Sequence, residues 1–218
     1  MRKLIVVFSI FLVACSALKS TDTLLKEVWN DDQQPRQQML KLTKAVTVEG
    51  RTELVDSLIL VNEIVERNDA RNIKVVDKIL KGGLPQGLSE ESYKTIWVVI
   101  DHAPLEKQEQ YLPLVEQMAN ASYIGLDEYA ILYDRVAIGQ NRPQRYGSQL
   151  VQFGNADNLQ RYVWPVEDAE KLDSLRNAVG MSSFYNYLKH IEETMGIPPV
   201  HNITLSIEEL NKMRGIEK

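Results

Sequence analysis

The chain has 218 residues, of which 44% are hydrophobic and 25% are charged, an ordinary composition for a globular protein. Its formal net charge of −5 argues against a nucleic-acid-binding surface, because such a surface needs clustered Lys and Arg. A single cysteine excludes a disulfide framework within the chain. Stability must therefore come from a hydrophobic core, for which the chain is long enough.

The N-terminus has the pattern of a secretory signal. Arg2 and Lys3 precede an apolar run, residues 4–13, that is too short to span a bilayer as a stable helix. Residues 12–15 read LVAC and resemble a bacterial lipobox. The resemblance implies a lipoprotein signal peptide, residues 1–14, and a lipid anchor of the palmitate type on Cys15. The alternative is ordinary cleavage beside a stray thiol.

The compartment and the domain boundaries follow from this resemblance. Ser16 stands where an aspartate would signal retention in the inner membrane, which favours the outer membrane of a bacterial cell envelope. Loss of the signal takes the formal charge from −5 to −7. Residues 15–23 have no periodic apolar face and are predicted to be a lipid-anchored tether. Residues 24–218 then form one domain, with no further segment apolar enough to cross a membrane.

Apolar side chains recur at helical spacing along most of this domain. Pro113 demands a kink or a local break in one helix, and Asp127 is a candidate N-cap for another. The predicted helical segments are residues 54–65 and 73–80, from Ser89 to His102, 105–119, 127–139, 168–178, from Ser182 or Ser183 to Met195, and 206–213.

Two short runs break the helical pattern. Residues 148–153 and 159–164 are rich in strand-favouring side chains, and the turn-forming sequence GNADN separates them. These runs predict a β-hairpin. The predicted fold is mainly α, a single helical domain with a small inserted β-hairpin.

Asp134 and Arg135 lie in a helix that is apolar on nearly every side. Such a helix is largely buried, and a buried charge is costly without a partner. Two interpretations remain open. Either Asp134 accepts backbone N–H groups while Arg135 braces another segment, or both side chains line a polar cleft.

His102 ends the apolar sequence IWVVIDHA and is the best acid–base candidate in the chain. It is a candidate catalytic residue, although a histidine at a helix C-terminus can also serve the structure alone. Asp101 is its neighbour, but no spacing supplies a third metal ligand, so no metal site is predicted. Neither a nucleophile elbow nor a phosphate-binding loop is present, and no cofactor is predicted.

Residues 142–149, RPQRYGSQ, crowd hydrogen-bonding groups into one loop. Together with NDDQQPR, GLP, HAPLEKQEQYLPL, YAILYDRV and WPVED, this octet resembles a bacterial family of uncharacterised proteins with a histidine, a D-R pair and a Q-x-Y-G-[TS]-Q signature. The resemblance covers roughly residues 25–190 and implies a shared helical architecture and a shared polar cluster. The matching positions are Asp32, Gln33, Arg36, Gly83, Pro85, His102, Gln108, Asp134, Arg135, Gln144, Tyr146, Gly147, Ser148 and Gln149.

We expect a ligand site where this loop meets the helices. The predicted ligand-binding residues are Asp134, Arg135, Gln144, Tyr146 and Gln149, beside His102. The alternative is that the loop only ties the helical body to the hairpin. The functional hypothesis is an envelope lipoprotein that binds a polar small ligand, a peptide or a glycan. A hydrolase or transferase that uses His102 as general base is the second possibility.

Overall fold

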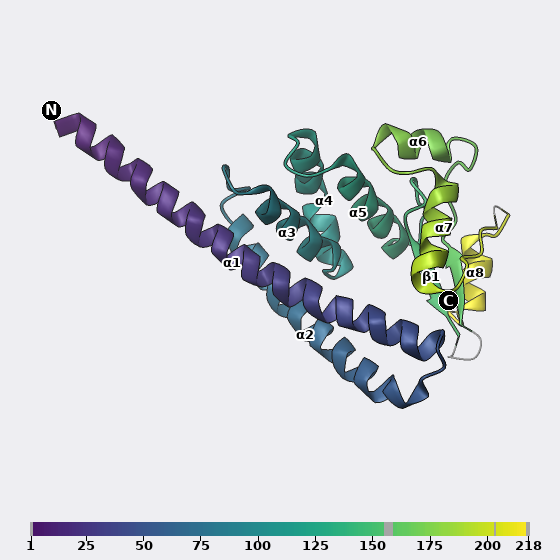
Figure 1. Ribbon diagram of the computed structural model, residues 1–218. Helices are drawn as coiled ribbons and strands as arrows, with labels where there is room; N and C mark the ends of the chain where they lie inside the picture. The colour runs from purple at the N-terminus through teal and green to yellow at the C-terminus, as the bar shows by residue number, and fades with distance from the viewer. Residues whose placement is uncertain (1, 155–158, 203, 217–218) are drawn as a thin grey trace.

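The first element is α1 (Arg2–Thr47), a helix of 46 residues. The structure is a computed structural model that describes residues 2–154, 159–202 and 204–216, with side-chain surroundings from residue 20 onward. Figure 1 shows the N-terminal part of α1 projecting from the body, while its C-terminal part lies along α2 (Val55–Leu80). A short 3-10 turn, η1 (Thr52–Leu54), joins the two helices into a hairpin.

The segment predicted to be a tether, residues 15–23, is helical instead. Leu25 and Val28 are buried in the core, so α1 is nucleated there, and extending an existing helix costs little. The segment is also attached to the body, because the Asp22 carboxylate accepts hydrogen bonds from Ser89 N at 3.1 Å and Ser92 Oγ at 2.6 Å. Within the described part of the chain, no helix combines the length and the hydropathy needed to cross a membrane.

Three further helices complete the main body: α3 (Glu90–Asp101), α4 (Leu105–Asn120) and α5 (Leu126–Gly139). The sequence predicts that this helix begins at Ser89, and the Ser89 hydroxyl indeed caps α3, while His102 is the C-cap. The prediction that Asp127 caps α5 is wrong. Gly125 is the N-cap, and the Glu128 carboxylate accepts its N–H at 2.8 Å, which leaves Asp127 in the first turn.

The predicted β-hairpin is confirmed. β1 (Leu150–Phe153) pairs antiparallel with β2 (Gln160–Val163), with Leu150 opposite Val163. Most of the predicted turn, residues 155–158, lies outside the described residues. The helices α6 (Leu172–Ala178), α7 (Phe184–Met195) and α8 (Ile207–Met213) surround the hairpin, as Figure 1 shows. The fold is mainly α with a small β-hairpin, as predicted.

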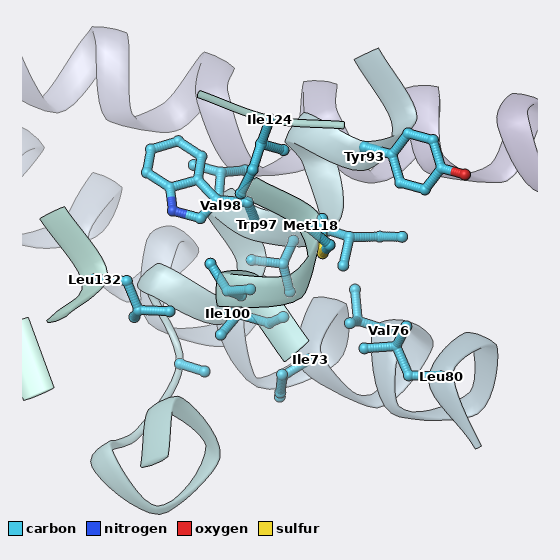
Figure 2. Close-up of a cluster of buried hydrophobic side chains, with 14 of the residues drawn as sticks. Ile73, Val76, Leu80, Tyr93, Trp97, Val98, Ile100, Met118, Ile124 and Leu132 are labelled. Atoms are coloured by element: carbon cyan, nitrogen blue, oxygen red, sulfur yellow. The ribbon is translucent and has the colours of Figure 1, made fainter. Parts of the chain in front are cut away.

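The main core gathers around α3, which contacts α1, α2, α4 and α5. Figure 2 shows Ile100 of α3 among Ile73, Met118 and Leu132 from three other helices. Ile100, Met118 and Leu132 are completely buried, and burying such a side chain stabilises the fold by about 1.5–3 kcal/mol. Because α3 is packed this tightly, the residues at its C-terminal end are held in fixed positions.

Candidate functional site

The centre of the site is His102, at the C-terminal end of α3. Its Nδ1 lies 3.0 Å from Oδ1 of Asp32 on α1. The Asp32 side chain is 1% exposed, whereas the His102 side chain is 20% exposed. A carboxylate only accepts hydrogen bonds, so Nδ1 carries a proton in this contact, and of the two neutral tautomers the contact selects the one without a proton on Nε2. The contact therefore fixes both the ring orientation and the tautomer.

Arg36 and Asp69 extend this contact on the α1–α2 side. The Arg36 guanidinium donates to both carboxylate oxygens of Asp69, at 2.8 and 2.9 Å, and lies 3.5 Å from Asp32. Asp32, Asp69 and His102 each place a possible metal-ligand atom within 4.8 Å of the others. These residues could hold a cation, but Arg36 already supplies the positive charge between the two carboxylates.

Asp101 and Arg135 extend the site on the α5 side. Arg135 Nε donates to Asp101 Oδ1 at 2.9 Å, and Asp101 Oδ2 lies 3.9 Å from His102 Nε2, beyond direct hydrogen-bonding distance. The Gln108 amide donates to the Asp101 backbone carbonyl at 2.8 Å and so braces the end of α3. The Arg135 side chain is 38% exposed, which makes it the most open member of the set.

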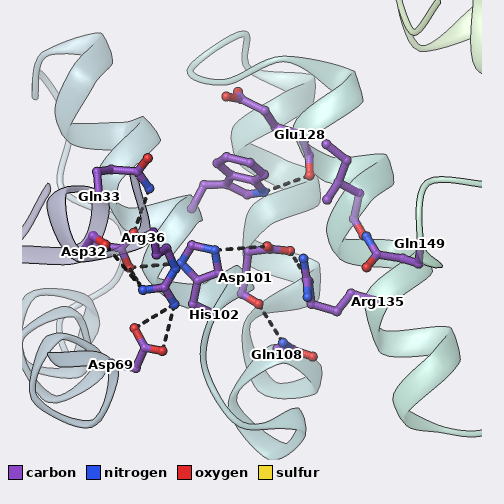
Figure 3. A network of polar contacts seen from close by, with 12 residues as sticks. Asp32, Gln33, Arg36, Asp69, Asp101, His102, Gln108, Glu128, Arg135 and Gln149 are labelled. Atoms are coloured by element: carbon purple, nitrogen blue, oxygen red, sulfur yellow. Dashed lines mark hydrogen bonds and ion pairs between the residues drawn. The ribbon is translucent and has the colours of Figure 1, made fainter. Parts of the chain in front are cut away.

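The six charged or titratable side chains form one continuous row, which we call the charge network. Figure 3 shows it running from Asp69 and Arg36, through His102, to Arg135. Acidic and basic groups alternate along it, so each carboxylate has a cationic or imidazole neighbour. Its members are Asp69, Arg36, Asp32, His102, Asp101 and Arg135.

Asp134 belongs to a different set of contacts, which we call the loop cradle. Its carboxylate accepts the backbone N–H groups of Arg145, Tyr146 and Ser148 at 2.7 to 3.1 Å, and the Ser148 hydroxyl at 2.9 Å. Burial raises the pKa of Asp134, while these four donors oppose the rise. The carboxylate is fully buried and its acceptor sites are occupied by the loop.

Gln144 completes the loop cradle. Its side-chain amide donates to the carbonyls of Gln149 and Trp164, at 3.0 and 2.7 Å, and accepts the N–H of Gln149 at 2.8 Å. Gln144 is fully buried, so these bonds tie the loop to the β-hairpin and leave none of the amide open to a ligand. Gly147 has φ +63°, and an added Cβ would lie 3.0 Å from the Phe184 ring, so the turn requires glycine.

Tyr146 and Gln149 are the remaining loop residues that the sequence predicted to bind a ligand. Tyr146 is buried with its ring edge-on to Tyr133, and burial raises the pKa of its phenol. The Gln149 amide is partly exposed and donates weakly to the Ile131 carbonyl, at 3.4 Å. Figure 3 shows Gln149 on the same side of His102 as Arg135. Gln149 is therefore the loop residue placed to meet a ligand beside the charge network.

The structure thus divides the residues that the sequence grouped together. It places His102 and Arg135 on either side of Asp101, and it places Asp134 and Gln144 in the loop cradle. Sequence reasoning missed the roles of four members of the charge network, Asp32, Arg36, Asp69 and Asp101, and Asp69 carried no signal at all. Asp32 carried a signal, since it is one of the positions matched by the family resemblance. Asp101 was noted only as the neighbour of His102, and its side chain proves to be the link between His102 and Arg135.

Comparison with known proteins identifies a family for the chain but assigns no activity to it. No curated protein and no solved structure matches it. The expected resemblance to a family of uncharacterised proteins is confirmed by a family model that covers residues 23–199, which contain the whole charge network and the loop cradle. The chain belongs to this family of unknown function, DUF6624.

Proposed function

We propose that the protein is a cell-envelope lipoprotein whose helical domain binds an anionic polar ligand beside His102. The observation that carries the proposal is that Arg135 is both held by Asp101 and partly exposed. Asp101 fixes its Nε, and the Arg135 side chain as a whole is 38% exposed. A guanidinium held at one edge presents its remaining N–H groups in a fixed fork, which matches a carboxylate or a phosphate. The partly exposed Gln149 amide adds a neutral hydrogen-bonding group nearby.

Binding is favoured over catalysis by the surroundings of His102. Both ring nitrogens face carboxylates, Asp32 at 3.0 Å and Asp101 at 3.9 Å. Asp134, which could have served as an acid or base, has its oxygens occupied by the loop. This arrangement supports an ordered, charged surface more directly than it supports proton transfer.

The test is a thermal-shift screen of the purified full-length protein against small carboxylates, phosphates, peptides and cell-wall fragments. A ligand that binds only the native state raises its unfolding temperature. We expect stabilisation of the wild type by carboxylate-bearing compounds and no stabilisation of Arg135→Gln. Gln140→Ala, an exposed amide at the C-cap of α5, is the matched control and should respond as the wild type does. Equal responses from wild type and Arg135→Gln would contradict the proposal.

A second candidate function rests on the contact between Asp32 and His102. A buried carboxylate on Nδ1 leaves Nε2 able to take a proton, the arrangement of a general base in a hydrolase or transferase. Asp32→Asn keeps the shape of the side chain but removes its negative charge, and its amide NH2 can donate to Nδ1 and so favour the other tautomer. If His102 is a base, Asp32→Asn and His102→Gln should both abolish turnover in an ester and amide substrate screen. Turnover by either variant at the wild-type rate would remove this candidate.

The lipid anchor is a separate part of the proposal. LVAC at residues 12–15 supports it, and several acyl chains on one cysteine hold a protein firmly on a membrane. In cells fed a palmitate analogue, the wild type should carry the label and sediment with membranes. Cys15→Ser should carry no label. If Cys15→Ser is labelled and retained as the wild type is, the lipobox interpretation is wrong.

A further inference from the structure

A cavity of about 510 Å³ lies between α1 and the first turns of α3. This volume falls within the range of small-ligand pockets. The side chains on which the argument depends are Lys26, Trp29 and Asn30 from α1, and Glu91, Lys94 and Thr95 from α3. None of them belongs to the charge network, so the cavity is a separate feature of the domain.

Trp29 gives the cavity an aromatic wall. One part of the indole packs against the main core, while another part lines the cavity. The other two tryptophans are buried, and their ring N–H groups donate to backbone carbonyls, Trp97 to Glu128 and Trp164 to Arg142. Trp29 is therefore the tryptophan whose ring can stack on a ligand, and a ring-shaped ligand with an apolar face suits it.

The charges around the cavity cancel. Asp22 and Glu91 are acidic, and Lys26 and Lys94 are basic. Asp22 is bonded to the start of α3, and Lys94 lies 3.1 Å from Glu128. A balanced lining gives no net attraction for a phosphorylated ring such as a nucleotide. It offers donors and acceptors together, which is what sugar hydroxyls require because each can donate and accept.

The cavity and the charge network lie along the same faces of two helices. α1 and α3 run parallel, since Asp22 contacts Ser92 near one end and Asp32 contacts His102 near the other. Thr95 and His102 are seven residues apart on α3, which places them on one face about 10 Å apart. On α1, Gln33 continues the face of Trp29 and Asn30, and Figure 3 shows it beside the network, across His102 from Arg135.

We infer that the ligand is an acidic oligosaccharide. One sugar ring stacks on Trp29 in the cavity, and a carboxylate farther along the chain pairs with Arg135. The neutral cavity selects the ring and the guanidinium selects the charge, so both features are needed for full affinity. This inference rests on the proposed function and specifies its ligand class.

Calorimetric titration of the full-length protein with two probes tests it. One probe is an oligosaccharide of galacturonic acid, which carries carboxylates, and the other is an uncharged oligomer of N-acetylglucosamine. We expect the acidic probe to bind at least about tenfold more tightly, as a charge-assisted contact allows. Arg135→Gln should remove this preference. Binding of the acidic probe should also quench Trp29 fluorescence.

Trp29 variants test the cavity separately. Trp29→Ala should weaken both probes by about fivefold to tenfold through loss of stacking, whereas Trp29→Phe should keep most of the affinity. Tyr185→Ala removes an aromatic side chain that is 74% exposed on α7, and it should change nothing. Circular dichroism of each variant confirms that it is folded.

The outcomes separate the two proposals. If Trp29→Ala binds the acidic probe as the wild type does while Arg135→Gln does not, the inference about the cavity is overturned and the proposed function stands. If Trp29→Ala loses binding but Arg135→Gln retains it, the acidic ligand class and the proposed function both fail. Absence of binding of both probes to the folded wild type overturns the inference, and the carboxylate and phosphate screen then decides the proposed function alone.

Discussion

Asp134 and Arg135 are adjacent in the sequence, yet one lies in a sealed, buried set of contacts and the other in a partly exposed one. Asp134 is fully buried, and the loop cradle occupies its acceptor sites with backbone N–H groups. Arg135 is part of the charge network, and its side chain remains partly exposed. The first arrangement satisfies a buried carboxylate inside the protein and leaves no acceptor for a ligand. The second holds a charged group in place while leaving part of it accessible, which is what a binding site requires.

The largest effect is expected from Asp134→Ala. The substitution leaves three loop N–H groups and the Ser148 hydroxyl without their acceptor inside the protein. We expect the free energy of unfolding to fall by about 3–5 kcal/mol. Urea denaturation measures this fall. Asp56→Ala, at an exposed position in the first turn of α2, is the control and should change stability by less than about 1 kcal/mol. Similar losses for both variants would contradict the view that the loop cradle stabilises the fold.

Gln144→Ala should have the next largest effect. It removes an amide that satisfies the N–H and C=O of Gln149 and the carbonyl of Trp164, all at the base of the hairpin. The expected loss is about 2 kcal/mol, because buried polar groups are left unpaired. The same denaturation experiment measures it, with exposed Gln140→Ala as control. A loss below about 0.5 kcal/mol would mean that water reaches these backbone groups and replaces the hydrogen bonds of the amide.

Arg36→Gln probes the charge network at its less exposed end. The substitution removes the cation between Asp69 and Asp32, although His102 and Gln33 still contact Asp32. We expect a loss of about 1–2 kcal/mol, smaller than at Asp134 because Asp32 keeps two partners. Arg51→Gln breaks an exposed pair, Arg51 with Glu53, and should cost less than about 0.5 kcal/mol. Equal costs would show that the network behaves as a surface ion pair.

The smallest expected effect is a pH dependence of the free energy of unfolding, caused by Tyr129 near the loop. Tyr129 lies beside Tyr133, whose ring meets Tyr146 of the loop. Burial, reinforced by Glu116, raises the pKa of Tyr129 to about 12, from an ordinary value near 10. The native state therefore keeps this proton above pH 10. Its contribution to stability is present below pH 10 and is lost as the pH rises towards 12.

Tyrosinate absorbance followed to high pH checks this prediction. Burial also raises the pKa of Tyr111 to about 12, so the native wild type should show at least two late-ionising phenols. Tyr129→Phe should show one fewer, and its stability should decline less between pH 10 and pH 12. Tyr185→Phe is the exposed control. If Tyr129→Phe shows as many late-ionising phenols as the wild type, Tyr129 is exposed to solvent and its pKa is not raised.

Local signals predicted most of the fold. Ser89, Ser183 and Ser206 each cap the helix that follows them, and the turn formers between residues 153 and 159 separate two real strands. The site depended on contacts that no local pattern encodes, since Asp32 and His102 are 70 residues apart. The sequence left two roles open for Asp134 because the choice depends on the conformation of a loop that begins eight residues later. Contacts of Asp22 with α3, likewise distant in sequence, explain why the expected tether is ordered.

The continuity of α1 sets how far the domain can stand from a lipid on Cys15. Asp22, whose side chain is bonded to α3, lies seven positions after Cys15 on the same helix, and a helix rises about 1.5 Å per residue. The body would therefore lie only about 10 Å beyond the acylated residue, on a stiff arm. A helix of this length lets the domain tilt relative to the membrane but does not let it move away from the membrane. If Cys15 carries the proposed lipid, a ligand or partner must therefore come to the membrane surface, because this short helix cannot carry the domain far from it.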